Sequence, residues 1–132
     1  MIYTLGYSGW TPDQIRQYLL DHQALLIDIR YKPLSRHHQW RRGARQALVC
    51  PYYRWIQELG NKAYKEKPRR IEIADMDTGL TRLGVIVQTV PTVMLLCGCP
   101  TLEECHRLTV AQEIEARWQV PVEHLPVPAR RP

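Results

Sequence analysis

The 132-residue sequence contains no phenylalanine, so seven tyrosines and four tryptophans supply its aromatic bulk. These rings carry polar groups that need hydrogen-bond partners when they are buried, which makes some of them candidates for lining a site. No stretch reaches the roughly 18 apolar residues that a membrane-spanning helix requires. The amino-terminal residues also lack the cationic start and apolar run of a signal peptide. We therefore expect a soluble protein with no membrane partner.

Cysteine is scarce and unevenly placed. Three of the four cysteines, Cys97, Cys99 and Cys105, lie close together in the sequence and far from Cys50. A secreted domain held by disulfides would normally spread its cysteines, so this spacing indicates a reducing compartment, and we expect the cytoplasm. The sequence also lacks a Walker phosphate loop and a dinucleotide-binding glycine motif.

Basic residues outnumber acidic ones, 18 Lys and Arg against 13 Asp and Glu, which gives a formal net charge of +5. Fourteen of the 18 are arginines, whose planar guanidinium matches phosphate and carboxylate groups. A basic balance can simply keep a small protein in solution. A nucleic-acid or nucleotide partner is the more specific interpretation.

Strand-like apolar segments alternate with helical patterns along the chain. We predict strands at 2–8, 24–29, 52–56, 92–96 and 120–125, and helices at 11–22, 78–89 and 101–118. Capping boxes mark two helix starts, one at Thr11 with Gln14 and one at Thr101 with Glu104. Residues 30–45 are expected to form a loop and a short helix, and 61–77 mostly loop.

This alternation is typical of βαβ units. The continuous apolar run at 24–29 is typical of a strand that is covered on both faces of a parallel sheet. The sequence therefore predicts one three-layer, Rossmann-like α/β domain over residues 1–126, with a mostly parallel sheet of four to five strands. A Pro- and Arg-rich tail follows at 127–132.

Polar segments follow three of the predicted strands, at residues 6–8, from 28 onward and from 97 onward. Ligands of open parallel sheets bind outside the carboxyl ends of the strands. We therefore expect these segments to meet across one cleft that takes an anionic ligand.

The segment 28–45 carries six cations and Trp40, with no acidic residue after Asp28. Interleaved cations and an aromatic ring suit a phosphate backbone and a stacked base, although a solvated helix face has the same composition. Asp28 ends an apolar strand and needs a partner, for which Arg30 and Arg36 are the candidates. The predicted anion ligands are Ser8, Arg30, Ser35, Arg36 and Arg107.

A second group of reactive residues follows the strand at 92–96. With Thr101 as the helix cap, Cys105, His106 and Arg107 would lie in the first two helical turns, where thiolates are favoured. Either Cys97 or Cys105 is then a candidate nucleophile, or Cys97 is simply a core residue. The predicted catalytic residues are Cys97, Cys105, His106 and Asp28.

A zinc site formed by the three clustered cysteines and His106 is disfavoured. Neighbouring residues on a helix point about 100° apart, and the paired spacing of a zinc knuckle is missing. We expect neither a metal nor a cofactor.

Several motifs occur in order over residues 2–125. They are Tyr3-Thr-Leu-Gly-Tyr-Ser8, Leu26-Ile-Asp-Ile-Arg30 with Pro33, Ser35 and Arg36, Leu59-Gly60, Leu95-Leu-Cys97, and Cys105-His-Arg107. Together they resemble the domain-of-unknown-function 488 family. The resemblance implies a small Rossmann-like α/β domain without an established activity. The family pattern places His and Glu where this sequence has Tyr7 and Cys99, which implies an altered or lost activity.

Two functions fit these patterns best. The first is binding or processing of nucleic acid or nucleotides through the basic segment. The alternative is a small thiol-dependent enzyme that acts on a phosphorylated or otherwise anionic substrate. Docking of an acidic protein on the basic face is a third interpretation, and whether the chain is an enzyme stays open at this stage.

Overall fold

The computed structural model of the chain describes residues 1–33, 52–66, 70–98 and 101–128. The loop and short helix expected within 34–45 lie outside these ranges. The strands are β1 (Ile2–Gly6), β2 (Ala24–Asp28), β3 (Tyr53–Trp55), β4 (Thr92–Cys97) and β5 (Val122–His124). The helices are α1 (Pro12–His22), α3 (Met76–Val87) and α4 (His106–Trp118), with short 3-10 turns η2 (Gln57–Leu59) and η3 (Leu102–Glu104).

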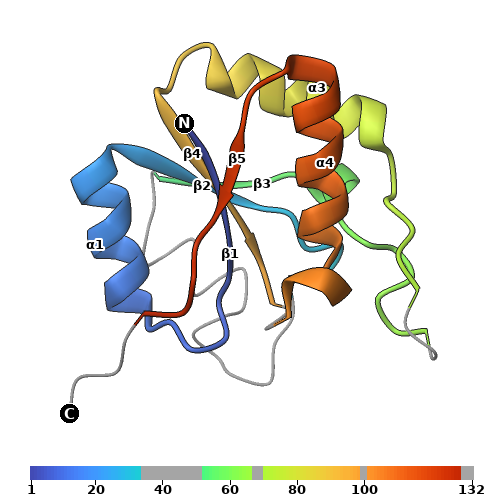
Figure 1. Cartoon of the computed structure of the whole chain (residues 1–132), viewed down its shortest axis with the longest axis horizontal. Coiled ribbons are helices and arrows are strands. Elements are labelled where there is room, and N and C mark those ends of the chain that lie inside the picture. Colours follow the sequence, from blue (N-terminus) through green and yellow to red (C-terminus); the bar gives the residue numbers. More distant parts are fainter. Residues whose placement is uncertain (34–51, 67–69, 99–100, 129–132) are drawn as a thin grey trace.

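The five strands form one sheet in the order β3-β2-β4-β1-β5, and every described pairing is parallel (Figure 1). This confirms the predicted α/β class. None of the helices in the described ranges is long and apolar enough to cross a membrane.

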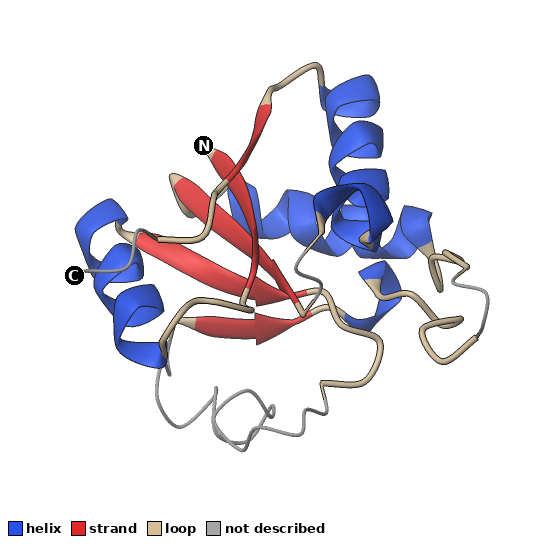
Figure 2. Ribbon diagram, turned by 60° about the horizontal axis from the view of Figure 1, so that its bottom comes forward, coloured by secondary structure: helices blue, strands red, loops and turns tan. Residues whose placement is uncertain are grey.

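Alternate side chains of each strand enter two separate apolar clusters, as the two-residue period of a strand requires. On β4, Leu95 and Cys97 pack with residues of α3 and α4, whereas Met94 and Leu96 pack with residues of α1. Figures 1 and 2 show the resulting layers, with α1 on one face of the sheet and α3 and α4 on the other. The domain is therefore a three-layer α/β structure.

The first predicted capping box is confirmed. The Thr11 side chain accepts from the backbone N–H of Gln14 at 3.1 Å, and the Gln14 side chain accepts from the Thr11 N–H at 2.8 Å. Helix α3 begins two residues before the predicted start, because Asp75 caps it by accepting from the Thr78 N–H at 3.1 Å. Local polar groups thus fix where both helices begin.

The second predicted capping box is wrong. The Thr101 side chain makes no capping hydrogen bond, and residues 102–104 form a 3-10 turn that ends at Cys105. Cys105 has extended backbone angles, φ −106° and ψ 139°, and is itself the N-cap of α4. The prediction failed because the backbone bonds from Glu104 to Thr101 and from Cys105 to Leu102 close a tighter turn first. His106 and Arg107 are consequently the first two residues of α4.

Candidate functional site

The carboxyl ends of β1 and β4 lie side by side, and their connections lead to helices on opposite faces of the sheet. Such a point in an open α/β sheet is where ligands usually bind. Here the Tyr7 N–H donates to the Cys97 carbonyl at 2.9 Å, and a Cβ added to Gly98 would lie 2.7 Å from the Tyr7 hydroxyl oxygen. The Tyr7 phenol therefore packs directly on Gly98. Ser8 follows in an exposed turn.

Asp28 and Arg30 form a buried ion pair at the end of β2. The Arg30 Nε donates to Asp28 Oδ1 at 2.8 Å, and its Nη2 donates to Oδ2 at 2.7 Å. Asp28 is fully buried and Arg30 is 7% exposed. Asp28 also accepts from the Tyr53 hydroxyl at 2.5 Å and from the Arg30 backbone N–H at 3.1 Å. The carboxylate thus has several donors.

Burial lowers the pKa of the Arg30 guanidinium, but its hydrogen bond to Asp28 and the charge of that carboxylate more than offset this, so the pKa is raised. The Tyr7 ring also lies under the guanidinium, 5.4 Å from its central carbon. Arg30 is therefore the partner that Asp28 needs. The other candidate, Arg36, lies outside the described residues, as does Ser35.

The chain after Arg30 is fixed by neighbouring side chains. The Trp55 indole donates to the Arg30 carbonyl at 2.8 Å, and the Gln57 amide donates to the Tyr31 carbonyl at 3.0 Å. A Cβ added to Gly60 would lie 2.3 Å from the Tyr31 backbone nitrogen, so this close approach requires glycine. Tyr53 and Trp55 are not among the site residues predicted from the sequence, although the polar groups of their rings were the available signal.

The cysteines of the site face a cation on α4. Cys97 and Cys105 are both fully buried. The Arg107 Nη1 donates to the Cys97 sulfur at 3.5 Å, and the Arg107 backbone N–H donates to the Cys105 sulfur at 3.5 Å. Burial lowers the pKa of Arg107, but its hydrogen bond to Cys97 and the charges of both sulfur groups raise it overall. Arg107 thus contacts both sulfur atoms, one through its side chain and one through its backbone.

His106 connects this group to β2. Its Nε2 lies 2.6 Å from the Ile29 carbonyl oxygen, and its Nδ1 lies 4.0 Å from the Cys105 sulfur. A carbonyl oxygen can only accept, so Nε2 carries the proton, and in the neutral ring Nδ1 is an acceptor that faces the sulfur. The imidazole is 6% exposed.

The two groups meet at one edge of the sheet but on opposite faces. Asp28 lies on the same face as Leu26, which belongs to the α1 cluster, whereas Cys97 belongs to the α3 and α4 cluster. The backbone of Ile29 connects the ion pair on one face with the cysteine and histidine group on the other. Among the described residues, Asp28 and Cys97 therefore do not face one another across the single cleft expected from the sequence. Arg30 and Arg107 have internal partners, at 7% and 5% exposure.

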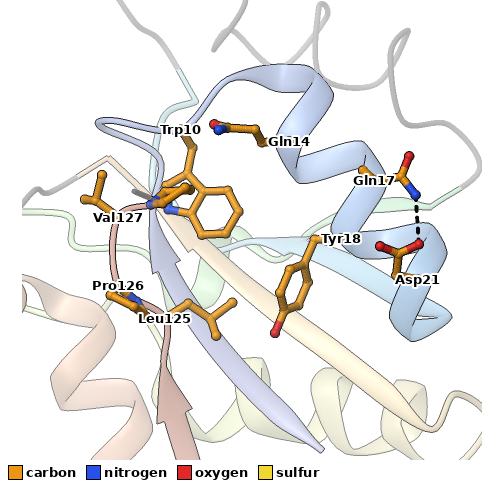
Figure 3. A pocket seen from close by; sticks show the side chains of 9 residues that line it. Trp10, Gln14, Gln17, Tyr18, Asp21, Leu125, Pro126 and Val127 are labelled. Carbon is orange, nitrogen blue, oxygen red and sulfur yellow. Dashed lines mark hydrogen bonds between the residues drawn. The ribbon is translucent and has the colours of Figure 1, made fainter. Parts of the chain in front are cut away.

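A cavity of about 630 Å³ lies elsewhere, between α1 and residues 125–128 (Figure 3). Trp10, Tyr18 and Leu125 give it a largely apolar wall, and Gln17 and Asp21 lie hydrogen-bonded to each other at 2.7 Å beside it. Of the predicted anion ligands that the structure describes, namely Ser8, Arg30 and Arg107, none lines this cavity.

Fold and site together define a small parallel α/β domain that carries an Asp–Arg pair and a Cys–His–Arg group at the carboxyl edge of its sheet. The family model described as "Domain of unknown function DUF488" matches residues 13–114. This range covers more than half of the chain, and the protein belongs to that family. A search of curated proteins finds no match.

Proposed function

We propose that this protein binds single-stranded nucleic acid or nucleotides through the basic segment that leaves the carboxyl end of β2. The observation that carries the proposal is the distribution of charge. Eight of the 18 Lys and Arg, and none of the 13 Asp and Glu, lie in 34–51, 67–69 and 129–132. The remaining ten cations and 13 acids give the rest of the chain a formal charge of −3.

The exposed arginines among the described residues support the same proposal, because neighbouring carboxylates neutralise the charge of several of them. Arg70 pairs with Glu66 and Glu72, Arg82 with Glu58, and Arg117 with Asp77 and Glu113. An arginine that already faces carboxylates contributes little to the attraction of a polyanion. The excess positive charge is concentrated in the segments named above, of which 34–51 is the longest.

The position of this segment also suits a ligand site. It starts just after Asp28 and Arg30, at the carboxyl edge of the sheet, where open α/β domains bind their ligands. Arginines at 36, 41, 42 and 45 alternate with Trp40 and two histidines, a composition suited to phosphates and stacked bases. A cytoplasmic location belongs to the proposal and is supported by the spacing of the cysteines, three of which lie within nine residues of one another.

Fluorescence anisotropy with labelled single-stranded RNA and DNA oligonucleotides tests the proposal. Binding should weaken steeply with salt, because each phosphate contact contributes about −0.7 to the log–log slope. Replacing Arg41, Arg42 and Arg45 together by alanine should reduce the magnitude of that slope by about 2. No binding at about 50 mM salt would refute the proposal.

A matched control removes the same number of positive charges from arginines that are paired with acidic residues. The triple variant Arg70→Ala, Arg82→Ala and Arg117→Ala loses three cations that already face acidic groups. Its salt slope should stay close to that of the parent protein. Equal losses in both triple variants would mean that net charge alone drives binding, which contradicts a defined site.

A further inference from the structure

We infer that Cys97, Cys105 and His106 form a binding site for a divalent zinc ion, with a coordination position left for a further ligand. The inference goes beyond the proposed function and does not depend on it. Two sulfurs and one imidazole nitrogen are ligands that Zn²⁺ accepts, whereas harder cations prefer oxygen. In this protein one atom from each of the three residues lies within 4.8 Å of the other two.

The backbone at Cys105 is what brings the three residues together. Two neighbouring residues within a helix point in directions about 100° apart and cannot easily share a metal. Cys105, however, is extended at φ −106° and ψ 139°, and only His106 begins the helix. Cys97 reaches the same point from the end of β4, on the sheet face that α4 covers. The neighbouring positions of Cys105 and His106 in the sequence therefore do not prevent them from sharing an ion.

His106 is already oriented as a ligand. Its Nε2 donates to the Ile29 carbonyl at 2.6 Å, and its Nδ1 faces the Cys105 sulfur at 4.0 Å. Histidines that bind zinc commonly donate their other ring N–H to a carbonyl or carboxylate, which fixes the ring and its tautomer. The same hydrogen bond here makes Nδ1, which faces the Cys105 sulfur, the ring nitrogen that would bind the ion.

The electrostatics of the site also permit a metal ion beside Arg107. This residue donates to both sulfurs at 3.5 Å, once from its side chain and once from its backbone. Two thiolates cancel the charge of a divalent ion, so loading adds no net charge to the buried site and releases two protons. Arg107 then keeps its hydrogen bonds to ligand sulfur.

The geometry requires a small contraction. Zinc–sulfur bonds of about 2.3 Å and zinc–nitrogen bonds of about 2.0 Å place tetrahedral ligand atoms roughly 3.5–3.8 Å apart. Atoms that lie within 4.8 Å of one another therefore need to approach by at most about 1.3 Å. Three protein ligands leave at least one position of a tetrahedral ion for water or an anion, as in catalytic zinc sites.

Cobalt substitution tests the inference on the full chain. Protein is treated with a chelator under reducing conditions and titrated with Co²⁺, followed by Zn²⁺. We expect thiolate-to-cobalt charge-transfer bands and tetrahedral d–d bands that saturate at one equivalent and are abolished by one equivalent of Zn²⁺. Zinc should also raise the temperature of unfolding, because the ion binds only the folded site. Absence of both responses would overturn the inference.

Variants then identify the ligands. Cys97→Ser, Cys105→Ser and His106→Asn should each weaken Zn²⁺ binding by at least about 10- to 100-fold, the loss typical of removing even an outer partner of a metal ligand. His22→Asn removes an imidazole at the end of α1, outside the site, and should bind like the parent protein. Circular dichroism of each variant shows whether it folds. Unchanged affinity in the folded Cys97→Ser or Cys105→Ser variant would refute the ligand set.

Two further measurements distinguish zinc binding from a nucleophilic role of Cys97 and from nucleic-acid binding. If Cys97 is instead a free nucleophile, it will react with iodoacetamide at the same rate with and without Zn²⁺, which contradicts metal binding. Nucleic-acid binding is measured on the chelator-treated protein, which contains no zinc. A failure of zinc binding therefore does not decide whether nucleic acid binds, and a failure of nucleic-acid binding does not decide whether zinc binds.

Discussion

The buried pair of Asp28 and Arg30 allows a quantitative prediction. Asp28→Asn keeps the shape of the side chain and removes its charge. The Arg30 guanidinium, 7% exposed, then remains in the interior without the carboxylate that it contacts at 2.7 and 2.8 Å. Removing one partner of such a pair typically costs about 3–5 kcal/mol. We therefore expect the free energy of unfolding to fall by about that amount, and the melting temperature by about 10–18 °C.

Urea unfolding followed by circular dichroism measures this change. The slope with denaturant should stay constant, because the variant exposes the same surface when it unfolds. The matched control is Asp77→Asn, which breaks an ion pair with Arg117 at a carboxylate that is 82% exposed. An exposed pair contributes up to about 1 kcal/mol, so the control should differ little from the parent.

A double variant distinguishes the loss of the attraction between Asp28 and Arg30 from the cost of burying the Arg30 charge without that carboxylate. Arg30→Met combined with Asp28→Asn removes both ionic groups, and an apolar side chain of similar length fills the space. Part of the lost stability should return. A loss below about 1 kcal/mol in Asp28→Asn, or no recovery in the double variant, would show that burial of the charge does not determine the cost.

Two further predictions concern single positions. Gly60→Ala should lower the free energy of unfolding in urea by more than about 2 kcal/mol, because its Cβ would lie 2.3 Å from the Tyr31 nitrogen. The control Gly84→Ala, inside α3 with its nearest neighbour atom at 3.7 Å, should stabilise the protein by about 0.5–1 kcal/mol. Similar values for both variants would contradict the close approach at Gly60. Burial and the charge of Arg107 lower the pKa of His124 from 6.5, so the unfolded chain binds the proton first. The stability difference between the parent and His124→Gln should therefore decrease as the pH falls from 6.5 toward the lower pKa of the folded state, and a constant difference would refute the shift.

Local signals in the sequence predicted most of the fold. The capping box at Thr11 and the continuous apolar run at 24–29 each depend on residues that lie close together in the chain. Their interactions form whatever the rest of the protein does. Helix α1 and strand β2 accordingly begin where the sequence predicts. The Thr101 box has the same letters and failed, because the backbone closed a 3-10 turn that ends at Cys105.

The partners of the site residues were only partly predictable. A buried acidic group at the end of a strand requires a cation, and Arg30 two residues later satisfies that requirement. Tyr53 donates to the same carboxylate from β3, 25 residues away. That contact depends on the pairing of β2 with β3, in which Leu26 lies opposite Tyr53. Composition alone does not specify this register.

The same limit explains why the two groups of site residues were expected to share one cleft. Neighbouring strands of a sheet present paired residues on the same face, and Asp28 pairs with Leu96. Cys97, the next residue along β4, must therefore face the opposite side. A shift of the register by one residue would have placed Asp28 and Cys97 together. The sequence predicts which strand ends carry polar groups, but the register determines the face on which each group acts.

The peptide at Ile29 joins the two faces and explains how they can act as one unit. Its N–H donates to the Leu96 carbonyl at 3.0 Å, and its carbonyl oxygen accepts from His106 at 2.6 Å. The next N–H, that of Arg30, donates to Asp28 at 3.1 Å. The ion pair on the α1 face therefore holds the backbone atom that orients the imidazole on the α4 face. Because the connection is a short stretch of backbone, a change at Asp28 reaches His106 without any contact between their side chains.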